Sequence, residues 1–138
     1  MVSTIDMQDM RYLNLFERVT RISTRYCFKY NETIFFCVPQ KMVSKAVGER
    51  GINMRTLNEI LHTKTKVIAL PRGVQDVEEF VHSIVSPVIF KGIDVKENEI
   101  ILGASTQSKA ALIGRNKKRL QEMQKIISDY FGKEFRIV

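Results

Sequence analysis

The segment Val47-Gly48-Glu49-Arg50-Gly51-Ile52-Asn53 decides the interpretation of the whole chain. It joins two stretches with helical patterns, residues 40–46 and 52–62, and an apolar run follows at 67–70. The two glycines let phosphate and sugar approach the main chain, because neither carries a Cβ. A helix that begins after the second glycine directs free N–H groups and its positive dipole end towards an anion. The segment therefore predicts a phosphate-binding turn. A simpler interpretation is a helical hairpin in which Gly48 caps the first helix in a left-handed conformation.

The flanking residues predict the same order of elements twice: helix, strand, strand, helix, helix, strand. In the first half these elements are residues 3–20, 26–30, 33–38, 40–46, 52–62 and 66–70. In the second half they are residues 74–83, 88–95, 99–104, 106–113, 118–130 and 134–138. Ser3, Thr4 or Asp6 can cap the first helix, and Asn31-Glu32 is the expected turn of the first hairpin.

The two halves align without gaps at a constant offset of 66 residues, which places Gly114 on Gly48. At this offset Ile34-Phe35-Phe36 coincides with Ile100-Ile101-Leu102, and Val47 coincides with Ile113. Only two copies exist, so the chain is a tandem of two small domains rather than a solenoid. Pro71-Arg72-Gly73 separates them, which predicts domains at 1–71 and 72–138. Each domain alone has a marginal core, so we expect the two to pack together as one unit.

Composition favours a globular, soluble protein with an anionic partner. The chain has 138 residues, 44% of them hydrophobic and 27% charged, and a net charge of +7. Such a charge is most simply explained by nucleic acid. No apolar run approaches the ~20 residues that span a bilayer, and no secretory signal is recognisable, so we expect a cytoplasmic protein without a membrane partner. Cys27 and Cys37 have no metal-binding spacing and are expected to be small buried hydrophobes, although their redox state stays open.

With both turns and the element order in hand, the chain resembles the archaeal NusA-like transcription factors, which consist of two tandem KH domains of type II. The residues that carry the resemblance are Leu15-Phe16-Glu17, residues 46–53, Glu79-Phe80-Val81, Ser86-Pro87-Val88 and Leu112-Ile113-Gly114-Arg115-Asn116. The resemblance implies an α/β (α+β) fold in which helices pack on a three-stranded mixed sheet in each domain. It also implies binding of single-stranded RNA and a role in transcription elongation or termination. The additional domains of the bacterial relatives are absent here, which leaves a contact with RNA polymerase open.

The candidate RNA-binding residues surround the two turns. They are Lys41, Lys45, Gly48, Glu49, Arg50, Gly51 and Arg55 in the first half, and Lys109, Gly114, Arg115, Asn116, Lys117 and Lys118 in the second. Between residues 106 and 138 there are eight basic and three acidic residues, so the positive charge gathers near the second turn. This turn ends in Lys117 where a second glycine is expected, and Lys disfavours positive φ. If the turn requires positive φ there, it is either strained or reshaped. The alternative is that Lys117 contributes a direct contact to phosphate.

Other side chains are assigned weaker roles. Aromatic residues at strand spacing, from Tyr26 to Phe36, are expected in the core rather than stacked on bases. The floor of a base-binding groove is expected to be aliphatic, with Val43, Ala46, Val67 and Ile68 as candidates.

An enzyme is poorly supported, because His62 and His82 lack metal-ligand spacing and no nucleotide-binding or nucleophile motif occurs. We therefore expect no cofactor and no metal. The alternatives to a transcription factor are a ribosome-associated or RNA-processing KH protein, and a polymerase-docking module that binds RNA weakly.

Overall fold

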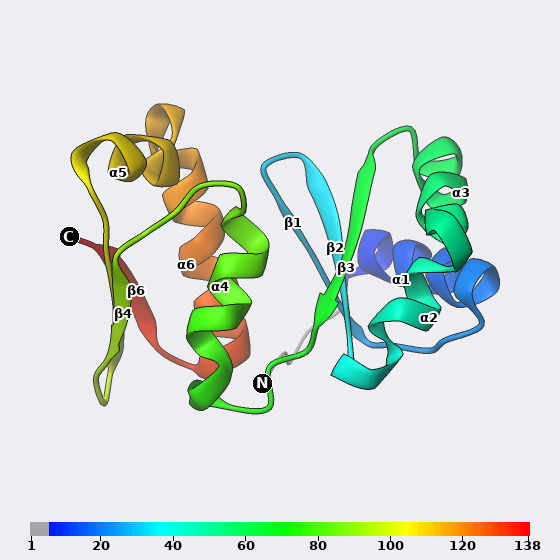
Figure 1. Ribbon diagram of the computed structural model, residues 1–138, viewed down its shortest axis with the longest axis horizontal. Helices are drawn as coiled ribbons and strands as arrows, with labels where there is room; N and C mark the ends of the chain where they lie inside the picture. The colour runs from blue at the N-terminus through cyan, green and yellow to red at the C-terminus, as the bar shows by residue number, and fades with distance from the viewer. Residues whose placement is uncertain (1–5) are drawn as a thin grey trace. The chain divides into compact units, whose positions relative to one another are not determined.

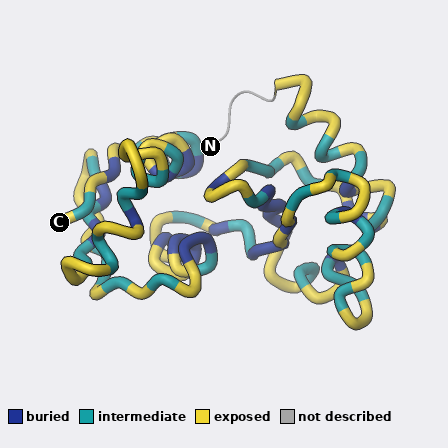
Figure 2. The backbone as a smooth tube through the Cα atoms, turned by 90° about the horizontal axis from the view of Figure 1, so that it is seen from above, coloured by how far each residue is buried: buried dark blue, intermediate teal, exposed yellow. Residues whose placement is uncertain are grey.

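The computed structural model describes residues 6–138, and these form two compact units, one within residues 6–70 and one within 71–138 (Figure 1). Each unit contains one three-stranded sheet with helices packed on it. The buried positions lie along the helices and strands inside each unit, and the turns are mostly exposed (Figure 2). No helix in the described part of the chain is long and apolar enough to cross a bilayer.

In the first unit the sheet order is β1-β2-β3, and its helices lie on one face of the sheet. The elements are α1 (Met7–Thr20), β1 (Tyr26–Tyr30), β2 (Thr33–Val38), η1 (Gln40–Met42), α2 (Val43–Val47), η2 (Glu49–Gly51), α3 (Ile52–Leu61) and β3 (Lys64–Ala69). Strands β1 and β2 are antiparallel, whereas β2 and β3 are parallel, with α2 and α3 in the crossover. A parallel pair requires such a long connection, so the G-x-x-G turn lies within the crossover.

Local chemistry sets the ends of these elements. Asp6 caps α1, because its Oδ1 accepts the backbone N–H of Asp9 at 2.7 Å. The alternative caps Ser3 and Thr4 lie outside the described residues. Asn31 and Glu32 both have positive φ, +50° and +59°, as a two-residue hairpin turn requires.

The helices and the sheet enclose an apolar core in the first unit. The rings of Phe16 from α1 and Phe36 from β2 stack with centroids 4.4 Å apart, and both side chains are fully buried. On the other face of the sheet Phe28 stacks on Phe35 at 5.1 Å, with Phe35 buried. Burial of Phe35 and Phe36 confirms the prediction that these aromatic residues pack inside the protein.

Neither Cys27 nor Cys37 forms a disulfide. Cys27 pairs with Phe36 across the hairpin and Cys37 pairs with Tyr26, so the two side chains point to opposite faces of the sheet. Burial is the main cause that raises the pKa of the Cys27 thiol to about 12, and Asp9 adds to it. Because the two side chains point to opposite faces, they are not positioned to form a disulfide with each other. The raised pKa keeps the Cys27 thiol protonated, and therefore unreactive, at neutral pH.

The second unit repeats this topology, with sheet order β4-β5-β6. The elements are η3 (Val74–Asp76), α4 (Val77–Val85), β4 (Gly92–Val95), β5 (Glu99–Gly103), α5 (Thr106–Ile113), η4 (Arg115–Lys117), α6 (Lys118–Phe131) and β6 (Glu134–Ile137). Strands β4 and β5 are antiparallel, and β5 and β6 are parallel. The predicted α+β class with two mixed sheets is confirmed, and the architecture is consistent with tandem KH-like units.

Several predicted boundaries differ from the structure, and three of the differences have a clear cause. The strand expected from residue 88 begins only at Gly92, because the Val88 N–H bonds to the carbonyl of Val85 and continues a turn after α4. The expected helix at 74–83 begins with a 3₁₀ turn and reaches Val85. Strand β3 begins at Lys64 rather than Lys66, because its parallel register with β2 extends to Thr33.

Candidate nucleic-acid interface

The first G-x-x-G turn is a tight 3₁₀ turn between α2 and α3. Gly48 adopts φ +84° and ψ 164°, and the Gly51 N–H donates to the Gly48 carbonyl at 3.0 Å. Arg50 and Gly51 are both left-handed, with φ +56° and +71°. A Cβ on Gly48 would lie 2.9 Å from the Asn53 side chain, so both space and φ exclude other residues there. At Gly51 the space is open, and φ alone favours glycine.

Two side chains from α3 hold this turn in place. The Asn53 amide donates to the Ala46 carbonyl at 3.1 Å, which joins the start of α3 to the end of α2. The Arg55 guanidinium donates to the Arg50 carbonyl. The sequence predicts that Arg55 contacts RNA. In the described structure its guanidinium stabilises the turn through the bond to the Arg50 carbonyl. Asn53 belongs to the segment at residues 47–53 that decides the interpretation of the chain. Its hydrogen bond to Ala46 could not be predicted from the sequence.

The second turn follows the same backbone path. Gly114 has φ +74° and ψ 172°, Asn116 has φ +56° and Lys117 has φ +61°. The Lys117 N–H donates to the Gly114 carbonyl at 3.2 Å, as the equivalent group does in the first turn. A Cβ on Gly114 would lie 2.6 Å from Cγ of Arg119, at the position equivalent to Asn53. The backbone of the second turn is therefore not reshaped. Lys117 instead takes the strained left-handed conformation that a glycine has in the first turn.

Both turns lead into helices whose N-termini are open to an anion. No side chain among residues 6–138 caps the N-terminus of α3 or of α6. The first N–H of each helix, from Ile52 or Lys118, donates to the carbonyl of Glu49 or Arg115 in the preceding turn. The next N–H groups have no acceptor within the helix, so a phosphate can accept from them. The helix dipole adds to this attraction.

Cations surround each turn on exposed positions. Lys41, Lys45 and Arg50 are exposed around the first turn, as is the acidic Glu49. Around the second turn the exposed residues are Arg115, Asn116, Lys117 and Lys118, whereas Lys109 in α5 is half-buried. Arg119, which adds to the positive charge of this region in the sequence, pairs with Glu122 at 3.1 Å and is only 13% exposed. The open positive charge at the second turn therefore comes from the residues before Arg119.

The aliphatic groove floor predicted from the sequence is wrong for three of its four residues. Ala46 and Val67 are buried in the core between helices and sheet. Ile68 is buried on the opposite face of the sheet, because neighbouring residues of a strand alternate in direction. Val43 alone is partly exposed beside the turn.

Away from the turns, Asp76 and His62 have structural roles. Asp76 accepts hydrogen bonds from the guanidinium and the backbone N–H of Arg72, which lower its pKa to about 2. His62 ends α3 with φ +53°. Within residues 6–138 no group of three or more His, Cys, Asp or Glu side chains is placed to hold a metal ion.

Comparison with known proteins places this geometry in context. No known protein-family model matches the chain. A probable transcription termination protein NusA from Halococcus morrhuae is 23% identical over 131 residues, covering 93% of this chain and 92% of that protein. A protein of the same description from Thermoplasma acidophilum is 22% identical over 133 residues, covering 94% and 90%. The chain is a distant full-length homologue of these archaeal NusA proteins. The resemblance inferred from the sequence is thus confirmed at the level of distant homology.

A solved structure supports the fold. The crystal structure of APE1850 matches with a TM-score of 0.67 and 23% sequence identity, covering 97% of this chain and 99% of that one. The two archaeal relatives are each described as a probable transcription termination protein.

Proposed function

We propose that this protein binds single-stranded RNA through its G-x-x-G turn at Gly48–Gly51 and the equivalent turn at Gly114–Lys117, and acts in transcription elongation or termination. The observation that carries the proposal is the shared backbone geometry of the turns at Gly48–Gly51 and Gly114–Lys117. Each turn precedes a helix whose N-terminus no described side chain caps, and each is surrounded by exposed cations. The names of the distant homologues support the transcription role, and RNA polymerase is the protein partner that this role implies.

The two turns are expected to hold the sugar-phosphate backbone, while the bases lie beside them. Backbone N–H groups at the start of α3 and α6 donate hydrogen bonds to phosphate oxygens, and Arg50, Lys45, Arg115 and Lys118 supply charge. Clamping of this kind requires unpaired bases that can turn towards the protein. We therefore expect the protein to bind single-stranded RNA rather than duplex RNA.

Competition binding tests this proposal. A short fluorescent single-stranded RNA is bound to the full chain, and unlabelled single-stranded or duplex RNA of equal mass is added. We expect the single strand to compete about tenfold better, since the duplex cannot place bases beside the turns. Equal or better competition by the duplex would contradict the proposal and favour general phosphate attraction. Co-purification with polymerase or with ribosomes after nuclease treatment separates a transcription role from a ribosomal one.

A further inference from the structure

The outer face of α1 and the end of α3 enclose an open groove of about 500 Å³ in the first unit. Its lining residues are Met7, Met10, Arg11, Asn14, Leu15, Arg18 and Ile60. Met7 is 87% exposed, Met10 53% and Ile60 44%. These are large apolar side chains that the core of the unit does not use.

The spacing of the α1 residues explains why they share one face. Met7, Met10, Asn14 and Arg18 recur every three or four residues, as one face of a helix requires. The core-facing side of the same helix carries Phe16, which is fully buried. Figure 2 shows the first turns of α1, next to the grey trace, as mainly exposed. An apolar patch of this kind with a polar rim is typical of a protein-interaction site.

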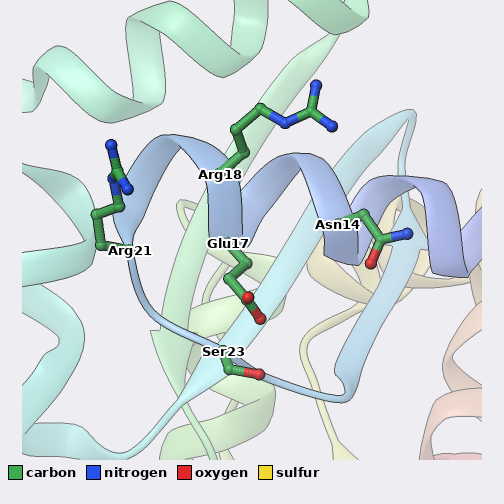
Figure 3. A pocket seen from close by; sticks show the side chains of 5 residues that line it. All are labelled: Asn14, Glu17, Arg18, Arg21 and Ser23. Atoms are coloured by element: carbon green, nitrogen blue, oxygen red, sulfur yellow. The ribbon is translucent and has the colours of Figure 1, made fainter.

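The rim of the groove is basic. A second hollow of about 540 Å³ adjoins it along α1, since both include Asn14 and Arg18. Arg21 lines this second hollow, as do Ser23 and the acidic Glu17. Within residues 6–138, Arg11, Arg18 and Arg21 have no acidic side chain in an ion pair. Figure 3 shows Arg18 and Arg21 extending to the opposite side of α1 from Glu17. The positive side of the helix is therefore available to an acidic ligand.

We propose that this groove binds an acidic amphipathic segment of a protein partner. Met7, Met10 and Ile60 would contact its apolar side, and Arg11 and Arg18 its carboxylates. Methionine adapts its shape to different apolar side chains, which suits a peptide ligand. A second copy of this chain is disfavoured, because it carries a net charge of +7. RNA is disfavoured too, because an apolar floor of Met and Ile offers phosphates no partner.

The groove and the first turn are at opposite ends of α3. Helix α3 begins at Ile52, directly after the turn, and Ile60 is one residue from its end. Eight residues of helix correspond to about 12 Å at 1.5 Å per residue. A peptide in the groove therefore leaves the turn accessible, and the protein can hold RNA and a protein partner at once. This inference goes beyond RNA binding and does not depend on it.

Fluorescence anisotropy with a synthetic peptide tests the proposal on the full chain. The probe is a labelled helical peptide of about four turns, with Leu on one face and Glu on the other. Controls are a scrambled peptide of the same composition and a peptide with Lys in place of Glu. We expect the probe to bind at least about tenfold tighter than either control. Chemical-shift changes should map to α1 and the last turn of α3.

Paired variants assign the binding to the groove. Arg11→Glu with Arg18→Glu should weaken probe binding about tenfold, and Met10→Ser with Ile60→Ser should do the same without changing charge. Arg25→Glu, at an exposed position of the same unit outside the groove, should leave binding unchanged. Thermal melts identify the variants that fold. A result from either folded groove variant is sufficient to test the proposal.

Three results would overturn the proposal. The scrambled peptide could bind as well as the probe, which indicates charge alone. Folded groove variants could keep wild-type affinity. A short single-stranded RNA could displace the probe, in which case the groove belongs to the RNA-binding surface and takes no protein segment.

Discussion

At the scale of single residues, Lys117 is the clearest departure from the repeat. It adopts φ +61° and ψ 22°, whereas the equivalent position in the first turn is Gly51 at φ +71° and ψ 21°. An L-residue in this region costs about 1–2 kcal/mol, because its Cβ crowds the backbone. The second turn therefore keeps the geometry of the first and bears a cost for a lysine at its end. That lysine adds one exposed cation beside the start of α6.

Replacing Lys117 by Gly should stabilise the protein and weaken RNA binding. The strain is relieved, and part of the gain is lost to the freedom of Gly in the unfolded chain, which leaves about 0.5–1 kcal/mol. Lys117→Ala keeps the Cβ and should give no such gain. Denaturant unfolding measures the free energy of unfolding. The slope of RNA affinity against salt should fall by about one charge in both variants. Equal stability of the Gly and Ala variants would contradict the strain.

Acidic substitutions in the turns should weaken RNA binding without unfolding the protein. Glu49→Asp with Arg50→Asp removes an exposed cation and places a negative charge beside the N–H groups at the start of α3. Asp also tolerates the left-handed φ of position 50. We expect about a tenfold loss of affinity, with stability changes within about 0.5 kcal/mol at each site.

Matched variants complete this experiment. Arg115→Asp with Asn116→Asp should weaken binding at the second turn. The loss of affinity relative to wild type should depend more steeply on salt than the loss at the first turn, because the second turn relies more on charge. Arg25→Asp lowers the net charge as much as the first-turn variant does, at an exposed site away from both turns. Anisotropy with a short RNA, at several salt concentrations, measures all three. Wild-type affinity in both folded turn variants would favour the polymerase-docking module over an RNA clamp.

At the scale of elements, the segment that opens the second unit is held by one carboxylate. Asp76 at the end of η3 accepts from Nε and Nη2 of Arg72 at 2.8 and 2.9 Å, and from its backbone N–H at 2.9 Å. These bonds orient the chain where it enters α4. The bonds to Arg72 also give the Asp76 carboxylate a structural role, which explains its presence without a role in catalysis.

The contribution of Asp76 to stability should disappear in acid. Its pKa in the folded protein is about 2, below the ordinary 3.8, because Arg72 binds the ionised form. A lowered pKa stabilises the folded state above the unfolded pKa, and this contribution is lost as pH falls from about 4 to about 2. The stability difference between wild type and Asp76→Asn should therefore narrow over this range. Denaturant unfolding at several pH values measures it, and a difference independent of pH would contradict the assignment.

At the scale of the whole molecule, the repeat gives two sheets with different outer faces. The helix-free face of the first sheet carries the stacked Phe28 and Phe35. The equivalent face of the second sheet carries an ion pair between Arg136 and Glu99, 3.1 Å apart. The same topology therefore supports an apolar face that is buried at Phe35 in the first sheet and a charged pair in the second.

We predict that the two halves of the chain tumble as one rigid unit in solution. The link at Pro71-Arg72-Gly73 is too short for a flexible connection, and the bonds from Arg72 to Asp76 restrict it further. NMR relaxation of the free protein should give one rotational correlation time for residues on both sides of the link. Clearly different correlation times would show that the halves move independently.

The sequence alone determined the order of elements, the positions of both turns and the relationship to archaeal NusA proteins. These follow from signals that are local in the chain: the aromatic and β-branched run of β2, Asn31-Glu32 at a turn with two positive φ values, and glycines where a Cβ would clash.

Only the tertiary structure decided what the surrounding side chains do. Arg55 and Arg119 read as open cations in the sequence, but they bond to the Arg50 carbonyl and to Glu122. Ala46 read as a groove floor, and it is fully buried. The apolar groove beside Ile60 depends on α1 and α3, which are far apart in the chain. The partner of a side chain is set by packing between segments that are distant in the sequence. The pattern of apolar residues within one segment therefore cannot predict it.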